Sequence, residues 1–351
     1  MNNPIFNRSD FTLCEVPVPK GYPQSQTHAG IAYWGGKFYM TTSPFPNKKL
    51  GKLEFYIRII VRKLSRGFLL NPVRADYYEN PCIYVGEERG EHFPTKFRLL
   101  SQHPLMECPD DYYGYPSYNS DPDLYVEDGT AYILNRSVFP TSNDYSDPNN
   151  PYPAIVRIFM IKGKFIDDKF VYESTNLIKE WNKPYASPCM TKYNGKYVLT
   201  FIDTNSANDG ETFNGIFVGQ AANPDDFART MEFKKVHFGE DSKVLPWHMS
   251  LFHFNNKLYT VIACVEKGKK EKIWQMLGEF NDDLSELKIF PHPLTDYNSY
   301  RGSASVDDRG VFVLYTTTVH EKIKGSKAVD GRNILMASMP FTDLLREIQK
   351  N

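Results

Sequence analysis

Ionisable and aromatic side chains occupy equivalent places in this chain of 351 residues, at the starts of short segments that alternate polar and apolar residues. The residues at these starts are His28, Asp121 with Asp123, Ser187, Trp247 with His248, and Arg301 with Ser303. Glu79 precedes one further segment of the same kind. Carboxylates and imidazoles are the side chains that most often transfer protons in catalysis. If these segments converge in space, the pattern predicts a site capable of acid–base chemistry.

Five stretches of the chain repeat one layout, in which a strand pattern leads through a tight turn into a second, more apolar strand pattern. The turns are Gly35-Gly36, Asp128-Gly129, Asn194-Gly195, Asn255-Asn256 and Arg309-Gly310, pairs typical of short hairpins. Third strands are expected at Cys82–Glu87, Ala154–Ile161, Gly215–Gln220, Lys272–Glu279 and Asn333–Ser338. One such unit cannot bury both of its faces, so the units must close into a ring. We therefore predict an all-β fold, a single five-bladed β-propeller domain over 1–351 with blades that start near 28, 121, 187, 248 and 302.

The innermost strand of each blade lines the central channel of a propeller, so residues just before these strands should gather at one mouth of the channel. Asp121 and Asp123 are two residues apart on one strand, which places both carboxylates on the same face. Such a pair would raise the pKa of one carboxyl group. Ion pairs with Arg136 or Arg301 are the structural alternative.

The other members of this set also have two interpretations. His28 and His248 occupy equivalent repeat positions and are either functional or simply hydrogen-bonded. Trp247 is either a packing residue or a platform on which a sugar ring stacks. Ser187 is expected to be a turn residue, because no His and Asp at a suitable spacing accompany it.

The segment from Ser120 to Val126, Ser-Asp-Pro-Asp-Leu-Tyr-Val, with the Asp-Gly turn that follows it, resembles the five-bladed propeller glycoside hydrolases. This group contains the family 43 arabinosidases and xylosidases, and the five-hairpin layout extends the resemblance over most of the chain. Within the group, the sequence is similar to a bacterial and phage branch that carries Asn-Pro, Ser-Pro and Trp-His motifs, here Asn80-Pro81, Ser187-Pro188 and Trp247-His248. The resemblance implies a propeller fold and a carbohydrate substrate.

Two of the three catalytic positions that the resemblance implies hold other residues in this chain. His28 stands where family 43 members have an Asp base, and Ser187 stands where they have an acidic Glu. Only Asp121 matches, at the position of the Asp that modulates the pKa of the acid. Glu79, Asp123 and His248 are the candidate substitutes.

We therefore predict a carbohydrate-active enzyme, a glycoside hydrolase in which Asp121 or Glu79 is the base and His248 or the remaining carboxylate is the acid. The predicted substrate-binding residues are His28, Asp123, Arg136, Trp247 and Arg301. A non-catalytic carbohydrate-binding propeller is the alternative. A metal-dependent enzyme that uses the two histidines with Asp121 is a third hypothesis, disfavoured because no histidine pair has i,i+2 or i,i+4 spacing there. We expect no metal and no cofactor.

Composition limits the classes of partner that we expect this protein to bind. The formal net charge is −1, and no basic field points to nucleic acid. No apolar stretch approaches the roughly 18 residues of a membrane span, so we expect an oligosaccharide or polysaccharide partner and no membrane.

The five cysteines lack C-x-x-C spacing and are predicted to be reduced core thiols. We expect a cytoplasmic protein, with a secreted or virion-associated location as the alternative.

Overall fold

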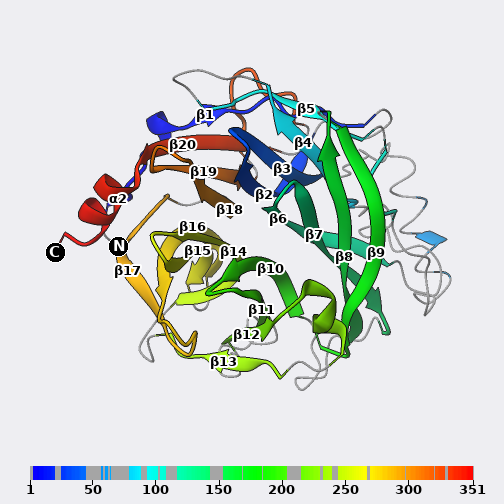
Figure 1. Cartoon of the computed structure of the whole chain (residues 1–351). Helices are drawn as coiled ribbons and strands as arrows, with labels where there is room; N and C mark the ends of the chain where they lie inside the picture. Colours follow the sequence, from blue (N-terminus) through cyan, green and yellow to red (C-terminus); the bar gives the residue numbers. More distant parts are fainter. Residues whose placement is uncertain are drawn as a thin grey trace.

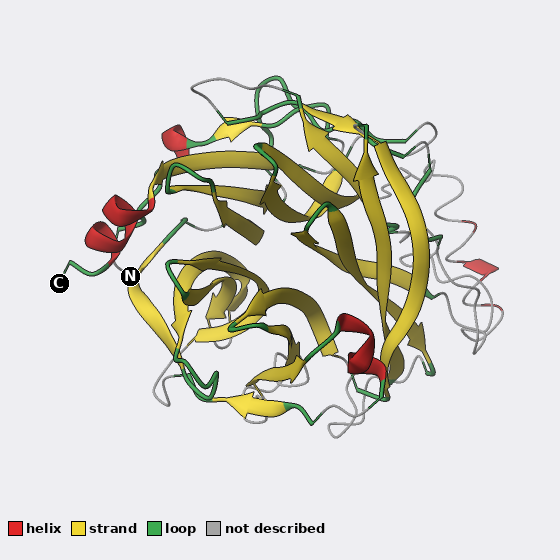
Figure 2. Cartoon of the chain, in the orientation of Figure 1, coloured by secondary structure: helices red, strands yellow, loops and turns green. Residues whose placement is uncertain are grey.

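The structure of the chain is a computed structural model that forms five four-stranded sheets around a common axis (Figures 1 and 2). It describes residues 3–19, 25–44, 57, 60–61, 64, 79–87, 93–101, 103–107, 117–142, 153–167, 169–183, 185–203, 215–229, 232–238, 244–266, 269–296, 298–319, 321–328 and 331–350. Neighbouring strands within each sheet are antiparallel. The predicted five-bladed β-propeller is confirmed.

Each blade runs from an inner strand at the axis to an outer strand at the rim. The innermost strands are β2 (Gln26–Trp34), β6 (Tyr118–Glu127), β10 (Tyr185–Tyr193), β14 (Val244–Phe254) and β18 (Ser299–Val306). The second strands are β3 (Lys37–Pro44), β7 (Thr130–Pro140), β11 (Lys196–Asp203), β15 (Lys257–Glu266) and β19 (Val311–Thr318). The third strands are β4 (Cys82–Gly86), β8 (Ala154–Ile166), β12 (Gly215–Ala221), β16 (Lys269–Phe280) and β20 (Ile334–Pro340). The outermost are β5 (Phe97–Leu99), β9 (Lys169–Trp181), β13 (Lys234–Val236), β17 (Leu287–Pro293) and β1 (Thr12–Leu13).

The ring is closed by both ends of the chain. Each innermost strand contacts the next, and β18 contacts β2. The outer strand of the fifth blade is β1, from the start of the chain, which pairs with β20 with Thr12 opposite Met336. Helix α2 (Phe341–Ile348) follows β20 and lies at the outside of the ring, near β17 (Figure 1). The two-residue strand β1 has no period-2 pattern long enough to be recognised from sequence.

Four of the five predicted tight turns have the expected backbone, with positive φ at both residues. The φ angles are 58° and 75° at Gly35-Gly36, 48° and 74° at Asp128-Gly129, 48° and 75° at Asn194-Gly195, and 48° and 59° at Asn255-Asn256. The fifth connection is longer, because β18 ends at Val306 and β19 begins at Val311. There the Asp307 carboxylate accepts hydrogen bonds from the backbone N–H groups of Arg309 and Val311 at 3.0 and 2.9 Å.

Every innermost strand carries a bulge near its start, which changes where the site residues lie. In the first three blades the pairing register shifts just after Thr27, Ser120 and Ala186. The residues that follow are His28, Asp121 and Ser187, with φ of 56°, 54° and 52°. Residues other than glycine rarely adopt this conformation outside turns, and within strands it persists only where the surrounding structure requires it. These residues therefore lie within the strands, at bulges that redirect their side chains, and not before the strands as predicted.

The bulges in the fourth and fifth blades are of a different kind. In each of them the register shift passes over one aromatic residue, Trp247 in β14 and Tyr300 in β18. His248 and Arg301 follow directly. All five innermost strands thus deviate from regular pairing close to the axis.

The hydrophobic core lies between blades, with one main cluster of buried apolar side chains at each of the five blade interfaces. Between the first two blades, for example, Tyr39 and Ile83 pack with Ile133 and Ile161. Gly30 lets the two innermost strands approach, since a Cβ there would lie 3.0 Å from Asp123 Cα. Apolar packing of this kind leaves the axis itself to polar side chains.

Four cysteines, Cys14, Cys82, Cys189 and Cys264, are buried and free, as predicted for core thiols. Cys108 lies outside the described residues. In the part of the chain that the structure describes, no helix has the length and apolar character needed to cross a membrane.

Candidate functional site

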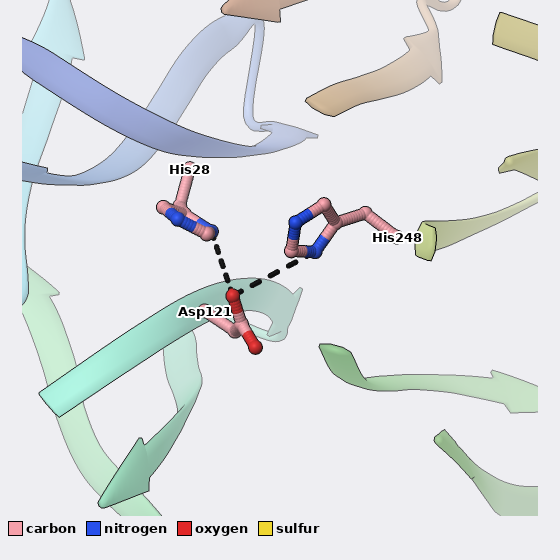
Figure 3. A group of neighbouring side chains, drawn as sticks. All are labelled: His28, Asp121 and His248. Carbon is pink, nitrogen blue, oxygen red and sulfur yellow. Dashed lines mark ion pairs between the residues drawn. The ribbon is translucent and has the colours of Figure 1, made fainter. Parts of the chain in front are cut away.

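Asp121 is the centre of a cluster of buried polar side chains near the propeller axis. Its side chain is completely buried, and its Oδ1 lies 2.8 Å from His28 Nδ1 and 3.6 Å from His248 Nδ1 (Figure 3). Its Oδ2 lies 3.0 Å from Arg136 Nε and accepts a hydrogen bond from the Ser187 backbone N–H at 3.1 Å. Burial opposes ionisation, but attraction to Arg136 and the two histidines holds the pKa of Asp121 well below its usual value. Asp121 is therefore a carboxylate whose two oxygens have separate partners.

His28 bridges two carboxylates from different blades. Its Nδ1 faces Asp121, and its Nε2 lies 3.2 Å from Glu79 Oε2. The His28 side chain is 2% exposed, so these carboxylates rather than bulk solvent surround its ring nitrogens. Its strained backbone at the bulge of β2 is what turns the ring toward the second blade.

His248 reaches the same carboxylate from the fourth blade. Its ring is perpendicular to the His28 ring, with the centroids 5.0 Å apart. Neither ring nitrogen of His248 has a hydrogen-bond partner, although the side chain is only 4% exposed. Burial holds its pKa well below the usual value, despite attraction to Asp121. His248 is therefore a neutral imidazole, with one unprotonated nitrogen and with its Nδ1 facing Asp121.

Glu79 is held just before β4 by contacts to its main chain and its side chain. Ser43 Oγ donates to its carbonyl oxygen at 2.8 Å, and Ser120 Oγ donates to its Oε2 at 2.8 Å. The same Ser120 hydroxyl lies 3.1 Å from Asp121 Oδ1. The facing oxygens of these two carboxylates therefore both contact one hydroxyl. The two oxygens thus lie closer together than the roughly 6.5–9.5 Å that separates the carboxyl groups of inverting glycosidases.

Asp123 does not form the predicted carboxylate pair with Asp121. The bulge between Ser120 and Asp123 breaks the alternation on which that prediction depended. Asp123 Oδ1 instead lies 3.4 Å from a terminal nitrogen of the fully buried Arg301. Its pKa is raised to about 7, as expected for one acid of the pair, but the cause is burial, which outweighs attraction to Arg301. Asp123 and Arg301 thus form a second layer of charged side chains. Arg301 links this second layer to the cluster, since its other terminal nitrogen lies 3.5 Å from His28 Nδ1.

Ser187 has a structural role in this geometry. Its hydroxyl donates to the Met249 carbonyl at 3.0 Å and accepts from the Met249 N–H at 2.9 Å. It therefore joins the third blade to the fourth, while its own N–H orients Asp121. Ser187 was expected to be a turn residue, but it lies within β10 at the bulge after Ala186.

The aromatic side chains of the fourth and fifth blades cover the two histidines. The half-buried Trp247 ring lies perpendicular to His248, with centroids 6.0 Å apart. Tyr300 lies 5.5 Å from His28 and 4.8 Å from His248 between ring centroids, and the Arg332 guanidinium lies over its ring. Tyr300 was missed from the sequence because it precedes the assigned blade start. The parallel between the aromatic–basic pairs Trp247-His248 and Tyr300-Arg301 was a signal that could have found it.

The sequence thus identified residues that the structure brings together from separate blades. His28, Glu79, Asp121, Arg136 and His248 form one connected cluster, Asp123 and Arg301 lie in a second layer, and Trp247 lies beside His248. Among the charged members, the side chains of Arg136 and Glu79 have the largest exposed fractions, 13% and 9%. Chemically, the cluster offers an ionised carboxylate, a neutral imidazole suited to act as a base or metal ligand, and a second carboxylate that contacts His28 and shares the Ser120 hydroxyl with Asp121.

Comparisons with known proteins place the fold. No family model matches the chain, and no curated protein matches it. Among solved structures, it is similar to an N-acetylgalactosamine deacetylase from F. plautii, with a TM-score of 0.64, 12% identity and coverage of 96% of this chain and 97% of that one. It is also similar to the RS223 β-xylosidase, with a TM-score of 0.55, 12% identity and coverage of 90% and 92%. For the GH43_1 enzyme from Xanthomonas citri in complex with xylose, the TM-score is 0.53, the identity 10% and the coverage 92% and 89%. The expected resemblance to propeller glycoside hydrolases is thus confirmed for the fold.

Proposed function

We propose that this protein is a carbohydrate-active hydrolase whose reaction takes place at the cluster of His28, Glu79, Asp121 and His248. One observation carries the proposal. Two carboxylates and two imidazoles from three blades meet around Asp121 Oδ1, and two of the four residues hold strained backbone conformations. Strain of this kind persists where the surrounding structure requires it and is concentrated at functional sites. Carbohydrates are the proposed substrates because the solved structures of similar fold include sugar-processing enzymes.

The proposed roles follow from the charge and contacts of each residue. His248, neutral and without a partner, is the base that activates water, and Asp121 stabilises positive charge on either imidazole. Glu79 is the second proton-transfer group, because it lies on the more exposed side of the cluster. Arg136 and Trp247 bind the sugar on that same side. Asp123 and Arg301 hold the second layer beneath the histidines.

A second candidate reaction is hydrolysis of an acyl group carried by a sugar. The close approach of Glu79 and Asp121 through Ser120 is too short for an inverting glycosidase pair, so the cluster suits either a retaining glycosidase or hydrolysis of an acyl group. A deacetylase acting on N-acetylgalactosamine is also among the proteins of similar fold. Both candidates are hydrolytic and use the same cluster.

The experiment is a screen that records two products. Purified protein is incubated with oligosaccharides, aryl glycosides and N-acetylated sugars, and both new reducing ends and released acetate are measured. Wild type is compared with Asp121→Asn and with Asp282→Asn, which removes an exposed carboxylate far along the chain from the cluster. We expect wild type and Asp282→Asn to give the same product and Asp121→Asn to give almost none. Equal activity of all three would refute the site, and glycan binding without either product would favour the non-catalytic alternative.

A further inference from the structure

We infer that His28, Asp121 and His248 form a binding site for one divalent transition-metal ion. The part of this ion in catalysis rests on the proposed hydrolytic function, whereas its binding does not. The sequence disfavoured a metal because no histidine pair with close spacing was present. The propeller supplies the pair from β2 and β14, which are far apart in the chain and meet at the axis (Figure 3).

The donor atoms have the spacing that one ion requires. Each of the three residues offers one ligand atom, and these atoms all lie within 4.8 Å of one another. Asp121 Oδ1 is 2.8 Å from one imidazole nitrogen and 3.6 Å from the other. Ligand atoms that surround a zinc-like ion at about 2.0–2.2 Å are themselves about 3–3.5 Å apart. Figure 3 shows both imidazole rings directed at the same carboxylate oxygen.

His248 is an independent indication that something binds between these groups. A buried imidazole normally has hydrogen-bond partners, because a polar group without one costs about 1–3 kcal/mol. Both nitrogens of His248 lack a partner, although the side chain is only 4% exposed. A metal ion on Nδ1 would satisfy the nitrogen that faces Asp121.

The contacts behind the three ligands are those that orient metal ligands in known sites. Histidine ligands usually donate their other ring N–H to a carboxylate, which fixes the tautomer. His28 has this arrangement, since Nε2 faces Glu79 at 3.2 Å and Nδ1 is directed at Asp121, with an Arg301 nitrogen 3.5 Å away from the same Nδ1. Asp121 is held in the same way, because Arg136 and the Ser187 N–H occupy Oδ2, while Oδ1 faces the two imidazoles and lies 3.1 Å from the Ser120 hydroxyl.

Electrostatics also allows a cation here. Two acceptor atoms 2.8 Å apart, His28 Nδ1 and Asp121 Oδ1, repel each other unless a proton or a cation lies between them. The charged groups around the site are three carboxylates (Glu79, Asp121 and Asp123) and two guanidinium groups (Arg136 and Arg301). These groups nearly balance in charge, so no strong net positive charge excludes a divalent ion.

The ligand types select the class of ion. Two imidazoles and one carboxylate suit Mn²⁺, Fe²⁺, Co²⁺, Ni²⁺ or Zn²⁺, whereas Ca²⁺ and Mg²⁺ prefer oxygen ligands alone. Three protein ligands leave further coordination positions open, which is the pattern of catalytic sites. An ion in such a site would lower the pKa of a bound water toward neutrality. It would then activate water in place of His248, which would serve as a ligand.

The test is direct binding to the full chain. Protein freed of metal with a chelator is titrated with Zn²⁺, Mn²⁺ and Co²⁺ by calorimetry, and the visible absorption of the Co²⁺ form reports its ligands. We expect one equivalent to bind and Mg²⁺ not to compete. His28→Asn, Asp121→Asn and His248→Gln should each weaken affinity by about 100-fold or more, and Glu79→Gln by about 10–100-fold. His253→Ala is the matched control, because it removes an exposed imidazole from the same strand as His248.

Each outcome separates this inference from the proposed function. Stoichiometric binding that the three substitutions abolish supports the site, even if no sugar is cleaved. Wild type that binds none of the three ions would overturn the inference, and hydrolysis by that metal-free protein would leave the proposed function standing. The inference also fails if Asp121→Asn binds as tightly as His253→Ala. Asn retains the left-handed backbone conformation of His28 and Asp121 at small cost, and circular dichroism of each variant checks that it is folded.

Discussion

Asp121 and Ser187 occupy the same backbone position in neighbouring blades and have different roles. Their φ angles are 54° and 52°, both side chains are fully buried, and each is followed by a proline within the register shift of its strand. The Asp121 carboxylate contacts two histidines and an arginine, whereas the Ser187 hydroxyl contacts only the backbone of Met249. The bulge is thus a repeated way to aim a side chain at the axis, and the side chain alone decides whether the position is chemical or structural.

The largest expected effect separates the two positions by activity. Asp121→Asn should lower turnover by about 1,000-fold or more, because the neutral amide neither pairs with Arg136 nor supports charge on the histidines. Ser187→Ala should stay within about 10-fold of wild type, since its N–H to Asp121 is unchanged. Both are measured as kcat/KM on the substrate found in the screen. Similar losses in the two variants would mean that the bulge itself, and not the carboxylate, governs activity.

His248 sharpens the comparison, because it faces the carboxylate of the second blade. His248→Gln should lower kcat by about 100-fold, the usual scale for losing a proton-transfer group. Its KM should change little, because the ring is buried beneath Trp247 and Tyr300. Steady-state kinetics with His253→Ala as control tests this prediction, which fails if KM rises while kcat is unaffected.

For the free energy of unfolding, we expect a clear loss at Ser187, the position where little loss of activity is expected. Ser187→Ala leaves the Met249 N–H without its partner between two blades, whereas the Met249 C=O still accepts from the Cys189 thiol; the cost should be about 1–3 kcal/mol in the free energy of unfolding. Urea unfolding followed by circular dichroism measures this loss. A variant as stable as wild type would show that the hydroxyl does not tie the third blade to the fourth.

The smallest expected effect is a difference in how the free energy of unfolding depends on pH, measured with a chelator present. Folding lowers the pKa of His248. Below about pH 6.5 the unfolded chain therefore binds a proton at this histidine that the folded chain does not. Stability should therefore fall as pH drops below about 6.5, with a contribution of at most about 1.4 kcal/mol per pH unit from this group. His248→Gln should flatten this slope, and Ser187→Ala should keep it, since serine does not titrate. Unchanged slopes in both variants would contradict the assignment of a neutral, buried imidazole.

Much of the architecture was determined by local sequence. The turn pairs such as Asn194-Gly195 and Asn255-Asn256 require positive φ, and the alternating segments around them can pair only as hairpins, so five units and a ring followed. The residues that line the axis were also recognisable, because the innermost strand of each blade starts there. Closure by Thr12–Leu13 was not predictable, since a two-residue strand has no pattern of its own.

The partners of each site residue were decided by the tertiary structure. Alternation along a strand predicted that the Asp121 and Asp123 carboxylates would form a pair. The bulge between them instead places Asp121 against the histidines and Asp123 against Arg301. Likewise, the distance between His28 and His248 in sequence argued against a metal, and the closed ring brings their rings to 5.0 Å. Sequence fixes which side chains each blade carries to the axis. Which of them meet depends on backbone irregularities and on ring closure, and both of these arise only when the five blades pack together.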